Sequence, residues 1–243
     1  MRKNIILILI CLLFFVFSGC GIIDYYFLKP HPETPLELLE AGKDALVNKN
    51  YKNAIKYFEK LKDKYPFSPY TVEAELLLAD SYFYSKKYSE AETAYKEFES
   101  LHPGHKKIDY VIFQIGKANY YQKKSIDLPQ DAIEEAISYF TKLIEAYPDS
   151  KYVPEAKNYL KKCRYLLAQH EVYVGNFYFR TKRYKGAWKR FEYIIQNYKD
   201  FSEIVNYAKY MAKISYIRYI MQISKKKEED VKGGLLIRLK RWL

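Results

Sequence analysis

The cysteine with the most distinctive chemical context in this 243-residue chain is Cys20. Two basic residues stand near the start of the chain, an apolar run follows at 5–17, and two small residues stand directly before the cysteine. This order of basic, apolar and small residues is the layout of a secretion signal. The run is shorter than the roughly 20 apolar residues that a membrane-spanning helix needs. The pattern therefore predicts export, with a thiol at the end of the signal.

The tetrapeptide Phe17-Ser18-Gly19-Cys20 resembles the bacterial lipobox. The resemblance implies a signal peptide of residues 1–19, cleavage before Cys20, and a lipid such as palmitate on the Cys20 thiol. Gly21 follows the cysteine where Asp would favour retention in the inner membrane, which implies an anchor in the outer membrane, on its periplasmic face. The alternative is a plain signal peptide or an N-terminal anchor in which this cysteine stands by chance.

The other two cysteines fit this interpretation. Cys11 would leave with the signal and Cys20 would carry the lipid, so Cys163 would be the remaining free thiol. A single thiol cannot form an intramolecular disulfide, and packing alone must then hold the exported chain together. Cys163 stands among apolar residues of a predicted helix, so we expect a buried, unreactive side chain.

The remaining polar residues form no pattern typical of catalysis. The sequence has no Gly-x-Ser-x-Gly motif and no glycine-rich phosphate loop. His102 and His105 lie in a predicted turn with no nearby cysteine to complete a zinc site, and the acidic residues alternate with lysines on helix faces. We therefore predict no catalytic residue, no metal and no cofactor. An enzyme whose site is assembled from residues distant in sequence is the alternative.

One apolar signature recurs four times along the chain. It consists of a small residue, an Ala twelve residues on, an aromatic residue four further, and a Pro eight beyond that. The third set widens the first gap from twelve to twenty, and the fourth has Lys199 in place of Pro. The sets are Gly42, Ala54, Phe58 and Pro66; Ala79, Ala91, Tyr95 and Pro103; Gly116, Ala136, Phe140 and Pro148; and Gly175, Ala187 and Phe191.

A period of 37 residues with two amphipathic segments per unit resembles the tetratricopeptide repeat. The small residues would let the two helices of a hairpin approach closely, the aromatic residue would fill the space between hairpins, and Pro would end the second helix. We predict an all-α solenoid of about five helical hairpins, and the alternative is an irregular helical bundle. Helical periodicity covers 36–62, 72–101, 109–122, 131–147, 152–182, 185–197 and 203–223.

Composition shifts divide the chain into four predicted segments. The signal peptide occupies 1–19, and an extended tether containing Pro30, Pro32 and Pro35 occupies 20–35. The repeats occupy 36–224 as one elongated domain, and a basic tail occupies 225–243. The tail has a predicted break at Gly233-Gly234, followed by a short cationic and apolar segment. Its helical form would suit an interfacial or docking segment, and a disordered end is the alternative.

Several local motifs support a more specific resemblance. Asn50-Tyr51-x-x-Ala54-Ile55 and Tyr65-Pro66-Phe67-Ser68 mark the first repeat, residues 123–130 lengthen the third, and AISYFTKLIEAYPDSKYVP spans 136–154. With the lipobox and the order of the repeats, these segments resemble the BamD family, the tetratricopeptide lipoproteins of the outer-membrane β-barrel assembly machine. The resemblance covers about residues 15–222, and the tail after Ser224 matches no part of it.

The resemblance implies a non-enzymatic scaffold. It implies that the N-terminal repeats bind unfolded outer-membrane proteins, and that the C-terminal repeats dock on the BamA-type barrel subunit beside other assembly-machine lipoproteins. Another tetratricopeptide lipoprotein, one that tethers peptidoglycan enzymes or a secretion or pilus apparatus, is the alternative.

The first helix of each hairpin would line the concave surface of the solenoid. The residues that flank the small position there are mainly aromatic and apolar with a few charges, which suits an extended or helical peptide. Core packing between hairpins is the alternative role for the aromatic members. The predicted peptide-binding residues are Leu39, Lys43, Leu46, Val47, Leu76, Asp80, Phe83, Tyr84, Phe113, Lys117, Tyr120 and Tyr121.

The charge balance favours anionic partners. The formal net charge is +12, and removal of the signal with its two basic residues lowers it to +10. We expect no nucleic acid partner, because the signal directs the chain out of the cytoplasm and the basic residues are spread over helix faces without a recognised binding motif. Acidic partner surfaces or lipid headgroups are the expected targets.

Overall fold

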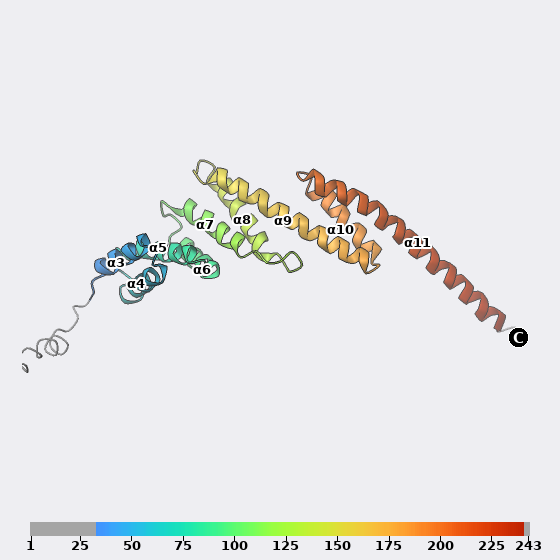
Figure 1. Ribbon diagram of the computed structural model, residues 1–243, viewed down its shortest axis with the longest axis horizontal. Coiled ribbons are helices and arrows are strands. Elements are labelled where there is room, and N and C mark those ends of the chain that lie inside the picture. The colour runs from blue at the N-terminus through green and yellow to red at the C-terminus, as the bar shows by residue number, and fades with distance from the viewer. Residues whose placement is uncertain (1–32, 241–243) are drawn as a thin grey trace, which may run out of the picture. The chain divides into compact units, whose positions relative to one another are not determined.

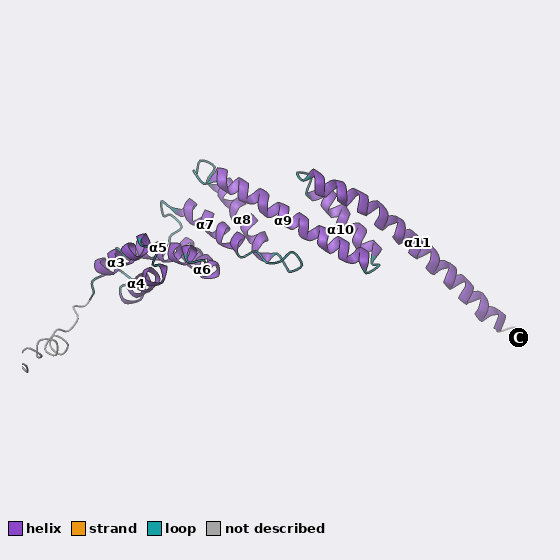
Figure 2. Ribbon diagram, viewed as in Figure 1, coloured by secondary structure: helices purple, strands orange, loops and turns teal. Residues whose placement is uncertain are grey.

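The computed structural model describes residues 33–240, with side chains as far as Gly233. This part of the chain contains nine helices and no strand, which confirms the all-α prediction (Figures 1 and 2). The helices are α3 (Pro35–Val47), α4 (Tyr51–Lys64), α5 (Thr71–Tyr84), α6 (Tyr88–Leu101), α7 (Ile108–Tyr121), α8 (Asp131–Ala146), α9 (Val153–Arg180), α10 (Tyr184–Asn197) and α11 (Ser202–Lys240).

The chain divides into two compact units, one ending at Leu77 and one beginning at Leu78, and each is described by itself. In the first unit α3 packs on α4. In the second unit each helix from α6 to α11 packs on the next. About five hairpins were expected; the helix order gives four, α3/α4, α5/α6, α7/α8 and α9/α10, followed by the single helix α11.

Three of the four hairpin turns share one backbone conformation. Lys49, Lys86 and Lys182 have φ values of 57°, 63° and 59°, in the left-handed region. Each Lys donates its backbone N–H to the carbonyl three residues earlier, and the next residue donates to the carbonyl five residues before it, at 2.8–3.0 Å. This closure of a helix end usually has Gly at the left-handed position. The turns therefore form at some backbone cost, which the hairpin packing must offset.

The turns between hairpins are also alike. Tyr65, His102, Tyr147 and Tyr198 each follow the last residue of a helix, and the residue three positions on donates its N–H back to their carbonyl at 3.0–3.1 Å. Pro follows the first three, whereas Lys199 follows Tyr198. Because α10 still ends at Asn197 with the same closure, Pro reinforces this helix end but is not required for it.

The small residue and the aromatic residue of each repeat meet inside the hairpin. Cβ atoms built at Gly42, Gly116 and Gly175 would lie 2.3, 2.6 and 2.8 Å from the rings of the aromatic residues of their own repeats. Those aromatic residues, Phe58, Phe140 and Phe191, are fully buried, as are the four repeat alanines. The predicted role of the small residues is confirmed. The aromatic residue was expected to fill the space between hairpins. Its ring also covers the first helix of its own hairpin.

The insertion in the third repeat forms an ordered loop between α7 and α8. The side-chain amide of Gln130 donates to the carbonyls of Ser125 and Leu128, at 3.0 and 2.7 Å. Nδ1 of His170 on α9 donates to the carbonyl of Ile126 at 2.6 Å. These bonds fold the insertion back on the hairpin and connect it to the following helix.

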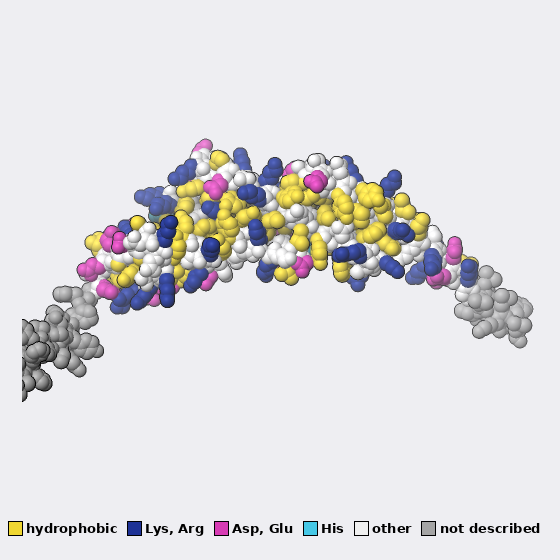
Figure 3. All heavy atoms as spheres, in the orientation of Figure 1, with side chains coloured by type: hydrophobic (Ala, Val, Ile, Leu, Met, Phe, Trp, Pro, Cys, Tyr) yellow, Lys and Arg dark blue, Asp and Glu magenta, His cyan; other side chains and the backbone are white. Residues whose placement is uncertain are grey.

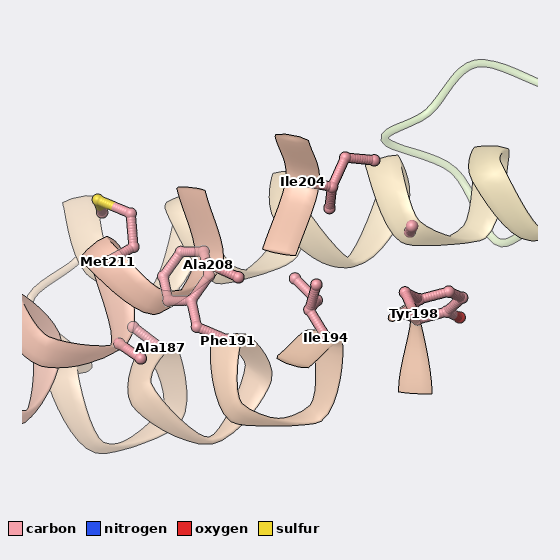
Figure 4. Close-up of a cluster of buried hydrophobic side chains, with 9 residues drawn as sticks. Ala187, Phe191, Ile194, Tyr198, Ile204, Ala208 and Met211 are labelled. Carbon is pink, nitrogen blue, oxygen red and sulfur yellow. The ribbon is translucent and has the colours of Figure 1, made fainter. Parts of the chain in front are cut away.

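The core between α10 and α11 shows how the second unit ends. Figure 4 shows Ala187, Phe191 and Ile194 of α10 opposite Met211, Ala208 and Ile204 of α11, in reverse order. The two helices are therefore antiparallel, and their shared apolar face is buried. The helix periodicity of 203–223 predicted this face correctly.

Two predicted boundaries differ from the structure. Pro35, expected in the extended tether, is the first residue of α3, where its missing N–H is harmless, and Thr34 caps the helix with Glu37. The break expected at Gly233-Gly234 is absent, since α11 runs on to Lys240. A glycine costs a helix only about 1 kcal/mol relative to alanine, so two of them do not by themselves end it.

The lipid-anchor prediction falls outside the described residues. Cys20, the signal at 1–19, and all of the tether before Glu33 lie there, as do residues 241–243. None of the described helices combines the length and the apolar character that crossing a bilayer would require.

The close contact at Gly116 leads to a stability prediction. We expect Gly116→Ala to lower the free energy of unfolding by about 1–2 kcal/mol, because the added methyl group would meet the buried Phe140 ring. The gain in helix propensity, about 1 kcal/mol, works in the opposite direction and is smaller than the overpacking cost. Urea unfolding followed by circular dichroism measures the change.

The matched control is Gly104→Ala in a turn, where a Cβ would meet nothing within 4 Å. We expect it to leave the unfolding midpoint nearly unchanged. Equal stability of the two variants would contradict the packing assigned to the small residue.

Candidate peptide-binding face

The ammonium group of Lys117 on α7 is the centre of an aromatic surface in the second unit. It lies 5.4 Å from the ring centroid of Phe83, 5.1 Å from that of Phe113 and 6.0 Å from that of Tyr159. Its Nζ is 3.8 Å from a carboxylate oxygen of Glu155. A cation among ring faces is attracted by their quadrupoles, more strongly where water is excluded. Lys117 thereby connects α5, α7 and α9.

A continuous set of rings surrounds this lysine, and we call it the aromatic cluster: Phe83, Tyr84, Tyr88, Phe113, Tyr120, Tyr121 and Tyr159. The rings of Tyr88 and Tyr121 stack at 5.1 Å, and both rest edge-on against Phe83 at 5.5 and 5.9 Å. The hydroxyls of Tyr121 and Tyr159 are 3.1 Å apart. Four helices, α5, α6, α7 and α9, contribute to the cluster.

The cluster is buried at its base and open at its outer edge. Phe83 and Phe113 are 9% and 2% exposed, whereas Tyr84 and Tyr121 are 51% and 40% exposed. Hydrophobic side chains among scattered Lys and Arg are visible over the second unit in Figure 3. Rigid aromatic rings held at the edge of a packed core can bind an apolar or aromatic side chain at little entropic cost.

A buried polar network lies next to the cluster. Asp80 on α5 accepts hydrogen bonds from the hydroxyls of Tyr95 on α6, at 2.5 Å, and Tyr110 on α7, at 2.7 Å. The amide nitrogen of Gln114 donates to the same two hydroxyls, at 3.3 and 3.0 Å. Burial raises the pKa of the Asp80 carboxyl, and the two tyrosine hydroxyls oppose that rise. Burial also raises the pKa of Tyr95, so its hydroxyl stays a donor.

The residue that follows each small repeat position makes a polar contact with the next first helix. Lys43 pairs with Glu73 at 2.9 Å, Asp80 accepts from Tyr110, Lys117 lies near Glu155, and Asn176 accepts from Tyr207 at 2.8 Å. We call these four contacts the polar ladder. Each contact joins one hairpin to the element after it.

Four of the twelve predicted peptide-binding residues are corrected by the structure. Leu39, Leu76, Phe83 and Phe113 are between 1% and 9% exposed and pack in the core. A side chain with so little accessible surface cannot line an open groove, so the core-packing alternative holds for them. They lie on the helix face that the next hairpin or the partner helix covers, as the repeat spacing requires.

The other eight predicted residues keep accessible surface. In the first unit Lys43 is paired with Glu40 and Glu73, Leu46 is half-buried and Val47 is 79% exposed. In the second unit the structure brings four together around Phe83, namely Tyr84, Lys117, Tyr120 and Tyr121. Asp80 lies in the polar network with Tyr95 and Tyr110.

Sequence reasoning missed Tyr88 and Tyr159. The sequence contains a pattern that could have identified Tyr88. The second helix of three hairpins begins with a tyrosine, at Tyr51, Tyr88 and Tyr184. Both Tyr88 and Tyr184 contact an aromatic residue five positions earlier at 5.5 Å. Tyr159 stacks on Phe140 at 5.4 Å, and the packing of α8 on α9 identifies it.

Cys163 and the histidine turn behave as packing elements. Cys163 is fully buried, and burial raises the pKa of its thiol to about 12, which agrees with the predicted apolar role. His102 and His105 pack on the ring of Phe98, at 4.8 and 5.1 Å. Among the described residues, no group of three metal-binding side chains lies together.

A surface cavity of about 610 Å³ lies between this turn and the turn at 146–150. Its polar groups are engaged in turn structure. Asp109 accepts from Ser150 Oγ at 2.7 Å and from the N–H of Tyr110 at 2.8 Å, and Nδ1 of His105 accepts from the N–H of Lys107 at 3.2 Å. Ser150 is thus bound to a carboxylate rather than to the imidazole, so the three do not form a nucleophile and base pair.

Stacked helical hairpins, closed by small-residue and ring contacts and joined by the polar ladder, define an all-α protein of the tetratricopeptide-repeat class. The chain belongs to the YfiO family of outer membrane lipoproteins, whose model matches residues 32–232. The resemblance stated from the sequence is thereby confirmed.

Curated relatives are named as outer membrane protein assembly factor BamD. The protein of Rickettsia prowazekii is 29% identical over 196 residues, which cover 81% of this chain and 78% of that protein. The proteins of Neisseria meningitidis and Caulobacter vibrioides are 27% and 26% identical over 68% and 70% of this chain. The chain spans 65% and 56% of the length of these two relatives.

Among solved structures, the first tetratricopeptide domain of human RPAP3 is similar with a TM-score of 0.44 and 25% identity. The alignment covers 58% of this chain and 97% of that domain. The fold assigned here rests on the helix order and hairpin contacts of the chain itself.

The buried carboxyl predicts a specific pH dependence. The folded-state pKa of Asp80 lies above that of a free carboxyl, which is about 4. The contribution of the protonated Asp80 carboxyl to the free energy of unfolding is therefore fully present below about pH 4 and is lost as pH rises through the folded-state pKa. Asp80→Asn cannot ionise. We expect the stability of Asp80→Asn relative to wild type to rise with pH above about 4 and then level off, as measured by urea unfolding at several pH values.

Tyr110→Phe provides the opposing control. It removes one hydroxyl that lowers the Asp80 pKa. The free energy of unfolding of this variant should therefore decline more with rising pH than that of wild type. A stability difference between Asp80→Asn and wild type that does not change with pH would contradict the raised pKa.

Proposed function

We propose that this protein is a lipid-anchored scaffold of the outer-membrane β-barrel assembly machine. Family membership and the BamD names of its relatives support the assembly role. The observation that carries the binding role is the aromatic cluster around Lys117, which presents half-exposed tyrosines on a packed helical frame. The scaffold acts by binding and placing other chains and performs no chemistry of its own.

The proposed ligand of the aromatic cluster is an unfolded outer-membrane protein segment. Strands of such proteins alternate apolar and polar residues and carry aromatic residues near the membrane interfaces. An apolar or aromatic side chain of the segment can rest on Tyr84 and Tyr121, while a polar neighbour meets Lys117. Val47 and Leu46 on α3 provide further apolar surface in the first unit.

The proposed partner of the C-terminal hairpins is the BamA-type barrel subunit, beside other lipoproteins of the machine. Exposed aromatic and aliphatic residues on α10 and α11, such as Tyr193, Tyr210 and Met221, support a protein contact there. Large side chains of this kind are enriched at interfaces.

Cys20 is the proposed lipid site, and the periplasmic face of the outer membrane is the proposed location.

A second candidate function keeps the anchor and the repeats but changes the partner. A tetratricopeptide lipoprotein can also tether peptidoglycan enzymes or a secretion or pilus apparatus. The +12 formal charge and the aromatic surface would suit either partner set. The partner experiment below separates the two.

The aromatic cluster predicts the residues on which peptide binding depends. We expect Tyr84→Ala and Tyr121→Ala each to weaken binding about five- to tenfold, because each removes a ring that is half accessible and rigidly supported. The probe is a labelled peptide with the sequence of one strand of an outer-membrane barrel, and fluorescence anisotropy measures its dissociation constant.

Tyr193→Ala is the matched control, since Tyr193 is 46% exposed on α10 and lies outside the cluster. It should bind the peptide as wild type does. Equal weakening in all three variants, or in none, would refute the assignment of the site to the cluster.

The lipid anchor and the partner set can be tested together in native membranes. We expect the wild-type protein, extracted in mild detergent, to bring down a large barrel protein with periplasmic domains. Cys20→Ser should shift the protein from the membrane to the soluble fraction, as measured by fractionation and mass spectrometry. Recovery of cell-wall enzymes or a secretin in place of the barrel protein would overturn the assembly function and leave the repeat fold standing.

A further inference from the structure

In the second unit, the loops inside the hairpins are more basic than the loops between hairpins. The loops inside hairpins are 85–87, 122–130 and 181–183, and those between hairpins are 102–107, 147–152 and 198–201. The first set contains six basic residues and one acidic residue, Asp127, whereas the second set contains four basic and two acidic residues. We call the six basic residues of the first set the basic edge: Lys86, Lys87, Lys123, Lys124, Lys182 and Arg183.

The three loops of the basic edge lie on one side of the second unit. Tyr88, which follows the first loop, stacks on Tyr121, which precedes the second, at 5.1 Å. His170 on α9 is hydrogen-bonded to the carbonyl of Ile126 in the second loop, and the third loop begins at Thr181, roughly 15 Å further along the same helix. Figure 1 shows the α7/α8 and α9/α10 loops on the same side of these helices. The basic edge therefore presents its charges toward one side.

The side chains of the basic edge are exposed and have no ionic partner. None of the six takes part in an ion pair within the part of the chain that the structure describes. Lysines on the helix faces differ, since Lys96 and Lys142 pair with carboxylates of the neighbouring hairpin. Lys86 and Lys182 also occupy left-handed backbone positions, where glycine is usual. The chain thus carries unpaired cations even where glycine would suit the backbone better.

Two exposed apolar side chains stand beside these charges. Ile126 and Leu128, in the second loop, are 37% and 44% exposed. The side chain of Gln130 holds this loop through hydrogen bonds to the carbonyls of Ser125 and Leu128, at 3.0 and 2.7 Å. Apolar residues among lysines on an ordered loop suit the boundary between water and a lipid bilayer. Basic residues meet anionic headgroups there, and apolar residues enter the layer beneath the headgroups.

We propose that the basic edge, with Ile126 and Leu128 at its centre, binds the surface of a bilayer that contains anionic phospholipids. Its charges lie on three successive loops rather than around one pocket, so an extended anionic surface matches them better than a single peptide does. Each Lys or Arg near such a surface contributes an attraction that salt screens. The contact strengthens attachment through a lipid on Cys20 and is reversible without that lipid. The inference goes beyond the proposed scaffold function and does not depend on which protein the repeats bind.

The test uses residues 20–243 with Cys20→Ser, so that no N-terminal lipid is present. Its probes are vesicles of phosphatidylethanolamine with phosphatidylglycerol, and vesicles of phosphatidylcholine alone, in a flotation assay. We expect the chain to float with the anionic vesicles at low salt and not with the neutral ones, and added salt should weaken the binding. Failure to float with anionic vesicles at low salt, or equal flotation with both kinds of vesicle, overturns the proposal.

Two triple variants assign the contact to the basic edge. The edge variant combines Lys86→Gln, Lys123→Gln and Lys182→Gln, which removes one charge from each loop. It should lower the partition to anionic vesicles about a hundredfold. The matched control replaces by Gln one exposed lysine from each loop between hairpins, namely Lys106, Lys151 and Lys199. It changes the net charge equally and should bind within about threefold of the parent. Equal loss in both variants overturns the assignment.

Tryptophan emission provides an independent readout of the apolar contact. The chain has two tryptophans, which Trp188→Phe and Trp242→Phe remove. In that background, Leu128→Trp should show emission that shifts to shorter wavelength when anionic vesicles are added, because the indole leaves water. Gly104→Trp, in a loop between hairpins, is the control and should show no shift. Unchanged emission from Leu128→Trp while the chain floats, or an equal shift in both variants, overturns the proposal.

An acidic protein surface is the competing occupant of the basic edge. We expect the edge variant to keep its binding to the barrel subunit in the pull-down from native membranes. An edge variant that loses the barrel subunit and still floats as the parent does would make the edge a protein interface and overturn the proposal. The vesicle assays contain no partner protein, so failure of the scaffold function and failure of the bilayer contact are distinguishable.

Discussion

The contact between a glycine on the first helix and a phenylalanine ring on the second sets the spacing of the two helices in three of the hairpins. At Gly42, Gly116 and Gly175 the ring occupies the volume that a Cβ would need. The helices can then approach closely enough to bury the repeat alanines completely. Interiors of this density tolerate little change in volume, so the position of each ring is fixed. The left-handed lysine turns at Lys49 and Lys182 close two of these three hairpins.

The same positions also arrange the polar groups. The residue after each small position points toward the next hairpin element, which gives the polar ladder its regular spacing. The second repeat has Tyr95 where the others have Phe, and its hydroxyl reaches Asp80. A single exchange of Phe for Tyr thus turns an apolar packing site into part of a buried network. Lys117, one repeat later, occupies the position of Asp80 and carries the opposite charge, which places a cation rather than a carboxylate among the rings of Phe83, Phe113 and Tyr159.

Sequence periodicity predicted most of the fold because the repeat residues act within their own hairpin. Every end of a predicted segment except that at 223 lies within two residues of a helix end, since Pro, Gly and the apolar spacing are local signals. The turns at 48–50 and 85–87, which lie inside two of the predicted segments, were not separated by the periodicity. The candidate site was predicted less well. Leu39 and Phe113 share a helix face with accessible residues, and spacing alone does not say which of them the next element covers. Tyr159 was missed because its place in the cluster depends on how α9 packs on α8, a contact between residues far apart in sequence.

The end of the second unit follows from the same geometry. Asn176 extends the polar ladder to Tyr207, so α11 stands where the first helix of a fifth hairpin would stand. The helix order gives it no second helix in the described chain. Tyr210, Ile217 and Met221 fall at spacings of seven and four, on one face of α11, and are 64%, 43% and 59% exposed. In a complete hairpin such a face would be buried by the second helix. The open apolar face of α11 supports the proposed docking of a partner subunit at this end, because a helix of that subunit could pack on it.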